Sequence, residues 1–247
     1  MENSVVKSLN VRIGSAPFGH STLRDKPPSG GHLYFDEIKM RSPTLVMALI
    51  TTSLVCSACS FAPAVSMKES QTHYRAAHNF EAQGDFVSAR DQYWKALVTA
   101  RSGGASPEVL SMLTYESGRT SGYTCQLEKS ESLLLESLKM EESLSPRNSR
   151  NIGIRLFELA RLTYDQRRYK ESAVYYSGAL REVESNNGEW TDPIAFAEIY
   201  EEYADALTQN GDQASAQIAL RKARNLREAS HGQSAKFKPV RYKCPRL

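Results

Sequence analysis

The chain has 247 residues, 40% hydrophobic and 24% charged, which is enough for one ordinary core or one short repeat array. Its formal charge of +3 is close to balanced and gives no reason to expect nucleic acid as the main partner. The balance is uneven along the chain, because residues 221–247 hold nine Lys or Arg and a single acid, Glu228.

Residues 1–39 have the composition of a segment without a packed core. They show no sustained apolar period and are interrupted by glycine and proline at Gly14, Pro17, Gly19, Pro27, Pro28, Gly30 and Gly31. We therefore expect this stretch to be disordered, or not to be translated if Met40 is the true start. A real cytoplasmic extension would instead argue against export.

Residues 40–58 have the features of an export signal. Met40 and Arg41 precede an uncharged, largely apolar run of 13 residues, 43–55, which is too short for the roughly 20 residues that span a bilayer. Ser57 and Ala58 then precede Cys59, a pattern that resembles the lipobox of bacterial lipoproteins, although Cys56 stands where that family usually has Leu. The resemblance implies a signal peptide over 40–58, lipid on Cys59 and a short tether over 59–66. A plain cleaved signal or a buried core helix is the alternative.

From 67 to 229 the pattern is helical throughout. Apolar residues recur at intervals of three and four, and turn-rich breaks fall at 101–107, 144–149 and 185–193. Ser106 and Asp192 each place a capping oxygen before a proline at the first helical position. No convincing strand pattern interrupts this region, so we predict an all-α fold of about eight helices.

The helical region also contains four segments in register, each with three small residues at equivalent sites. The sites are Ala77, Ala89 and Ala96; Gly118, Ser130 and Ser137; Ala160, Ser172 and Ala179; and Ala204, Ala216 and Ala223. This pattern resembles the tetratricopeptide repeat (TPR), which implies a right-handed superhelix of about four helix-turn-helix repeats. The spacings of 41, 42 and 44 residues exceed the usual 34, and Gln213 and Arg224 replace apolar residues in the fourth repeat. Longer helices or connections, and a polar face at the end of the array, would explain these departures.

The resemblance to TPR proteins implies a concave groove, lined by the first helix of each repeat, that binds a protein partner. Eight residues have the helical phase to point into it: Tyr74, His78, Tyr115, Arg119, Arg161, Tyr164, Glu201 and Asp205. Aromatic residues and Arg are enriched at interfaces, which favours this interpretation. The alternative is that several of them are solvated or form contacts within the array.

Signs of catalysis are weak. The five histidines have no metal-binding spacing, and Gly103 and Gly104 are not followed by the Lys-Ser or Lys-Thr of a phosphate-binding loop. Gly118 and Gly122 form a Gly-x-x-x-Gly spacing that favours close helix packing. We expect no enzyme activity, no cofactor, no metal, no small-molecule substrate and no nucleic acid.

Two cysteines would remain in the array and tail after cleavage before Cys59. In an oxidising periplasm we expect Cys125 and Cys244 to pair, which would fold the tail, 230–247, back along the array. Closing that loop would stabilise the fold by roughly 4 kcal/mol, less any strain. Two free thiols are the alternative. The basic tail is predicted to dock in the groove or to act as an arm for anionic surfaces, and docking fits the cysteines better.

Two functional hypotheses follow. The first is an outer-membrane lipoprotein, facing the periplasm, that helps to assemble an envelope machine; it resembles the pilotins of pilus secretins and the helical lipoproteins of barrel assembly. Ser60 after Cys59 is the residue expected for outer-membrane sorting. The second is a soluble cytoplasmic adaptor that starts at Met1. The two differ in whether residues 40–58 survive in the mature chain, and the sequence does not identify the partner.

Overall fold

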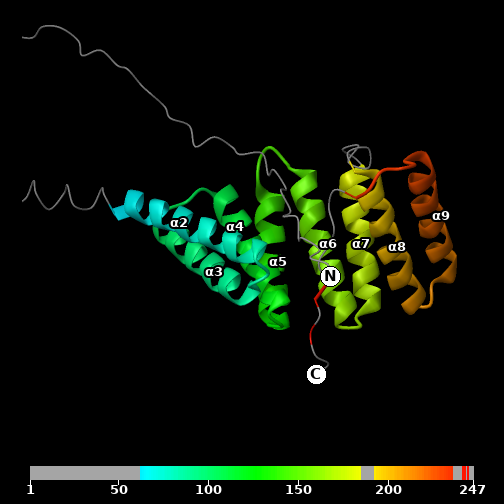
Figure 1. The fold of residues 1–247 in the computed structure, drawn as a ribbon, viewed down its shortest axis with the longest axis horizontal. Coiled ribbons are helices and arrows are strands. Elements are labelled where there is room, and N and C mark those ends of the chain that lie inside the picture. Colours follow the sequence, from blue (N-terminus) through cyan, green and yellow to red (C-terminus); the bar gives the residue numbers. More distant parts are fainter. Residues whose placement is uncertain (1–61, 185–191, 236–240, 243, 245–247) are drawn as a thin grey trace, which may run out of the picture. The chain divides into compact units, whose positions relative to one another are not determined.

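The computed structural model describes residues 62–184, 192–235, 241, 242 and 244, and within them the regular structure is entirely helical (Figure 1). The predicted signal peptide over 40–58 and Cys59 lie outside these ranges. The helices are α2 (Ala62–Ala82), α3 (Phe86–Ser102), α4 (Pro107–Tyr123), α5 (Leu127–Ser143), α6 (Ser149–Asp165), α7 (Tyr169–Glu184), α8 (Pro193–Gln209) and α9 (Gln213–Ala229). The predicted all-α class is confirmed.

The helices form four pairs, α2 with α3, α4 with α5, α6 with α7 and α8 with α9, and successive pairs stack in chain order (Figure 1). All twelve small sites of the sequence repeat are buried. At Gly118 an added Cβ would lie 3.1 Å from the backbone nitrogen of Leu134 in α5. Small side chains therefore let paired helices approach closely, as the repeat pattern predicts.

Helix N-caps and the turns between paired helices have similar features in successive repeats. The side chains of Asp85, Ser106, Asn148, Asp192 and Asp212 each accept a hydrogen bond from a backbone N–H in the first turn of the following helix. The predicted starts of α4 and α8 are thus confirmed. Between the helices of each pair one residue is left-handed, with φ of +79° at Gly84, +63° at Cys125, +61° at Arg167 and +86° at Gly211.

The long repeat spacing comes from long helices, since α3 to α6, α8 and α9 each have 17 residues. The predicted tether over 59–66 is partly wrong, because α2 begins at Ala62. Alanine favours helix, and the proline at 63 falls in the first turn, where its missing N–H is tolerated. Gln213 and Arg224 are exposed on α9, as expected for a polar outer face.

The second repeat has a polar interior where its small sites are serines. Ser137 of α5 accepts a hydrogen bond from the buried Arg155 of α6 at 2.7 Å. Arg155 also pairs with the buried Glu141 at 2.9 Å, and Ser111 of α4 donates to the same carboxylate at 2.8 Å. This network joins α4, α5 and α6 at the middle of the array, so that the first helices α4 and α6 are held at fixed positions.

Within the described ranges, no helix combines the length and the apolarity that crossing a membrane requires.

Candidate protein-binding face

The first helices of the pairs, α2, α4, α6 and α8, carry the side chains predicted to line a groove, and we call the surface they form the inner face. Arg119 of α4 forms an ion pair with Glu81 of α2 at 2.5 Å and another with Glu116 at 2.5 Å. Burial raises the pKa of Glu81, but the charge and hydrogen bonds of Arg119 outweigh it and lower that pKa overall. Predicted residue Arg119 therefore connects the first two repeats.

The other predicted residues of the first two repeats lie beside this ion-pair cluster. The Tyr74 hydroxyl and a ring nitrogen of His78 are hydrogen-bonded at 3.0 Å, and His78 is exposed. The Tyr115 ring lies 6.0 Å from the guanidinium of Arg119 and 5.2 Å from that of Arg155. His78 is the member of this group that remains most open to a partner.

A second cluster joins the third and fourth repeats. Arg161 of α6 is 1% exposed and bonds Glu202 of α8 at 3.0 Å, with Glu158 at 3.5 Å on its other side. The Tyr164 hydroxyl donates to the carboxylate of Asp205, which is exposed. Arg161 and Tyr164, the two α6 residues predicted to line the groove, thus both bind residues of α8. They form contacts within the array, which was the alternative to a role in partner binding.

Glu201 does not join the other predicted residues. Its carboxylate accepts two hydrogen bonds from Arg227 of α9, each 2.8 Å, whereas the adjacent Glu202 contacts α6. The physical reason is helical phase: Glu116, Glu158 and Glu202 each stand two residues before the first small site of their repeat. That recurring glutamate is the sequence signal that would have selected Glu202.

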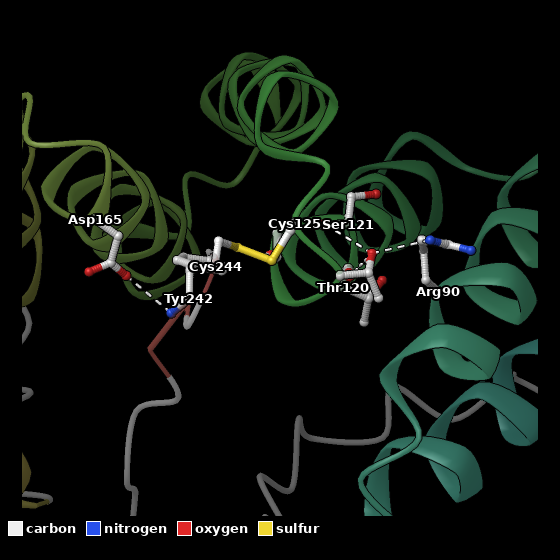
Figure 2. Close-up of a disulfide and its surroundings, with 9 residues drawn as sticks. Arg90, Thr120, Ser121, Cys125, Asp165, Tyr242 and Cys244 are labelled. Atoms are coloured by element: carbon white, nitrogen blue, oxygen red, sulfur yellow. Dashed lines mark hydrogen bonds between the residues drawn. A yellow bond between two sulfur atoms is a disulfide. The ribbon is translucent and has the colours of Figure 1, made fainter. Parts of the chain in front are cut away.

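Residues 241, 242 and 244, the described part of the tail's end, lie on the inner face beside α4 and α6. Cys125 and Cys244 form a disulfide with a Cα–Cα distance of 5.4 Å, and Figure 2 shows it next to Tyr242 and Asp165. The end of α4 is held in place by Thr124, which accepts a hydrogen bond from Arg90 at 3.3 Å and donates to the carbonyl of Thr120 at 3.1 Å. The disulfide joins the two cysteines that the sequence analysis expected to pair. The position of Cys244 agrees with the prediction that the tail docks in the groove.

Tyr242 fills a site between α4 and α6 and is 3% exposed. Its ring lies against Gly122, where an added Cβ would be 2.3 Å from Cε1, and its centroid is 5.1 Å from that of Tyr123. Its hydroxyl donates to Glu158 at 2.6 Å, and burial together with the Glu158 charge raises the pKa of Tyr242 well above 10. The phenol therefore stays a neutral hydrogen-bond donor at physiological pH.

Arg241 occupies a neighbouring acidic site. Its guanidinium donates to Asp165 at 2.7 Å, approaches Glu202 at 3.7 Å and lies 4.6 Å from the centroid of the Tyr164 ring. Burial opposes the charge of Arg241, yet the hydrogen bond and charge of Asp165 raise its pKa overall. The other oxygen of Asp165 accepts the backbone N–H of Tyr242 at 3.1 Å.

The sequence patterns did not indicate Gly122, Asp165, Arg241 or Tyr242 as site residues. The glycine pair at 118 and 122 was a usable signal for the first of these: Gly118 serves helix packing as expected, but Gly122 makes room for the Tyr242 ring. Among the described residues, no group of three or more His, Cys, Asp or Glu side chains is arranged to hold a metal ion.

Comparisons with known proteins identify the fold. BtubC from P. vanneervenii is similar, with a TM-score of 0.61, 18% identity and coverage of 72% of this chain and 70% of that chain. The TPR-like repeats of a Podosopora anserina protein assigned as a kinesin light chain give a TM-score of 0.52 at 15% identity, over 77% of this chain and 95% of that one. No protein-family model and no curated protein matches the sequence. The chain therefore has a TPR-like helical-repeat fold.

Proposed function

We propose that this chain is a protein-binding scaffold whose inner face holds an extended segment of a partner protein. The observation that carries the proposal is the docked tail: Arg241 and Tyr242 are bound there by side chains of α4, α6 and α8. A surface that binds one polypeptide segment through buried aromatic, charged and backbone contacts has the chemistry to bind another. TPR-like folds carry no chemistry of their own, so the function rests on this site and not on the fold.

We further infer that the scaffold is an outer-membrane lipoprotein, attached through Cys59 and facing the periplasm, that serves the assembly of an envelope complex such as secretin or pilus machinery. The signal-like run over 43–55 and the small residues before Cys59 support this location. The pairing of Cys125 with Cys244 also supports it, because structural disulfides persist in oxidising compartments. The chain is then tethered to the membrane with its inner face toward the periplasm, where a partner meets the docked tail.

The location is tested by the intact mass of the protein recovered from membranes of its native host. The proposal predicts a chain that begins at Cys59 and carries diacylglyceryl and acyl groups. A soluble, unmodified chain that starts at Met1 and has free thiols would contradict it and support the cytoplasmic adaptor instead.

The binding face is tested by site-specific photocrosslinking in the same host. In a C125S/C244S chain, whose tail is not tied to Cys125, a photoreactive amino acid replaces either Asp205, which is exposed on α8, or Val174, which is 64% exposed on the second helix α7. We expect a discrete adduct of one partner from position 205 and none from position 174. Equal labelling from both positions would contradict a specific inner-face interaction.

A further inference from the structure

The site occupied by Arg241 and Tyr242 has the properties of a two-residue recognition site. We propose that it selects partner segments in which an arginine directly precedes a tyrosine, and that the chain's own tail is a competitor held there by the Cys125–Cys244 disulfide. This inference rests on the proposed protein-binding function and specifies the partner's chemistry. We call the contacts of Asp165, Glu158, Gly122 and Tyr164 with the tail the Arg-Tyr site.

The arginine half of the site binds its occupant through a carboxylate and an aromatic ring. Asp165 accepts a hydrogen bond from the Arg241 guanidinium at 2.7 Å, and the guanidinium carbon lies over the Tyr164 ring, 4.6 Å from its centroid. The positive charge of the arginine is therefore stabilised by both partners at once. Tyr164 is itself held by its hydrogen bond to Asp205.

The tyrosine half of the site distinguishes tyrosine from phenylalanine. The missing side chain of Gly122 leaves room for a ring, and Glu158 accepts the hydroxyl hydrogen bond at 2.6 Å. Glu158 is 4% exposed, so a phenylalanine would leave one of its oxygens without that donor in a desolvated place. The Tyr123 ring adds an aromatic contact, tilted by 33° to the Tyr242 ring with 5.1 Å between the centroids.

Asp165 requires the two residues to be adjacent. One of its oxygens binds the Arg241 guanidinium and the other accepts the backbone N–H of Tyr242 at 3.1 Å. A single carboxylate therefore binds the arginine side chain and the backbone N–H of the next residue at the same time. This contact fixes the register of the bound segment, because the aromatic ring must follow the arginine at once to reach Glu158.

Charge complementarity favours a basic occupant. Three carboxylates at the site, Glu158, Asp165 and Glu202, are shared by Arg161 of the array and Arg241 of the tail. When the tail leaves, Arg161 is the cation that remains among the described ion-pair partners of these acids, so the site gains net negative charge. An incoming arginine restores the balance, which predicts binding that weakens with salt.

The disulfide determines whether a partner can compete. While Cys125 and Cys244 are joined, the tail is held at the site and its effective concentration far exceeds that of a free segment. A dithiol reductant would pass two electrons and two protons to the disulfide, giving two thiols here and a disulfide on the reductant. The tail is then free to exchange with a partner.

The test uses the full-length chain and a fluorescent synthetic peptide of residues 238–247 with serine in place of Cys244. The chain is prepared in three forms: oxidised wild type; a C125S/C244S chain; and a C125S/C244S chain that also carries Arg241→Ala and Tyr242→Ala, in which the site is empty. We expect binding by anisotropy to be tightest for the empty-site chain, weaker for the C125S/C244S chain and weakest for the oxidised chain. The C125S/C244S chain retains every tail contact except the disulfide, so it remains informative if the empty-site chain fails to fold.

Specificity is tested in both molecules. Replacing the peptide's arginine by glutamate, or Asp165 by Asn in the protein, is expected to weaken binding on the order of tenfold to hundredfold, the range for losing a charge-assisted hydrogen bond. Glu142→Gln is the matched control, since Glu142 is exposed near the end of α5, far along that helix from Cys125. Equal binding of the native and glutamate peptides, or no binding to either folded variant chain, would overturn the proposal.

The same peptide separates this inference from the proposed function. Partner crosslinking at position 205 that excess peptide does not suppress would overturn the Arg-Tyr site as the partner site and leave the scaffold function standing. Absence of any adduct there, with peptide binding intact, would overturn both, because the site would then serve the chain's own tail alone.

Discussion

Gly122→Ala is the substitution that most directly probes the docking of the tail. The new Cβ would lie 2.3 Å from Cε1 and 2.7 Å from Cδ1 of Tyr242, closer than carbon atoms can approach, so the ring must leave its site. The displaced tyrosine loses roughly 2 kcal/mol of burial and roughly 2 kcal/mol for its hydrogen bond to Glu158. The change from glycine to alanine in a helix returns about 1 kcal/mol. The free energy of unfolding should therefore fall by about 3 kcal/mol.

A double-mutant cycle in urea isolates this effect from other consequences of the new methyl group. In a chain that already carries Tyr242→Ala, Gly122→Ala should change the free energy of unfolding by less than about 1 kcal/mol, because the ring is gone and only the Ser130 hydroxyl, 2.9 Å from the new Cβ, has to move. Gly118→Ala is the matched control: its Cβ would meet Leu133 and Leu134 of α5, so its cost should be the same in both backgrounds. An equal loss from Gly122→Ala in both backgrounds would refute the docking of Tyr242 against Gly122.

Three further predictions concern the stability of the array. Cys125→Ser should lower the free energy of unfolding by roughly 4 kcal/mol, and dithiothreitol should reproduce that loss in wild type but not in the variant; wild-type unfolding unaffected by the reductant would argue against the Cys125–Cys244 disulfide. Arg167→Gly should raise the melting temperature, because glycine adopts the left-handed backbone conformation without the cost of about 1 kcal/mol that arginine incurs there. Lys170→Gly in helix α7 should lower the melting temperature, and a lower melting temperature for both variants would count against strain at the turn. The pKa of Glu81 is lower in the folded than in the unfolded chain, so ionised Glu81 stabilises the fold above its unfolded pKa, and this stabilisation is lost as the pH falls through the folded pKa. In urea titrations below a pH of about 4.5, the free energy of unfolding should therefore fall less for Glu81→Gln than for wild type.

The fold could be predicted from sequence because its determinants are local and repeated. Capping residues before prolines marked helix starts, and small residues at fixed intervals marked the tight helix pairs; both kinds of signal depend on residues close in sequence. The start of α2 at Ala62 was missed because alanine and an early proline are compatible with either a tether or a first helical turn.

The candidate site could be predicted only in part, because its contacts join distant segments. Tyr242 meets Glu158 across a sequence separation of 84 residues and Asp165 across 77, and no periodic pattern reports such contacts. Helical phase did place Arg161 and Tyr164 on the inner face. The glutamate that recurs two residues before the first small site would have selected Glu202 instead of Glu201. The cysteines were different, since only two remained after the predicted cleavage and their pairing had a single solution.

The chain's own tail occupies the inner face at which we propose that a partner binds, and disulfide mapping tests that position of the tail. Protein isolated from its native host is alkylated before reduction, digested and analysed by mass spectrometry. We expect one linked pair of peptides, containing Cys125 and Cys244 of the same chain. Alkylation of both cysteines, or a link between two separate chains, would contradict this expectation.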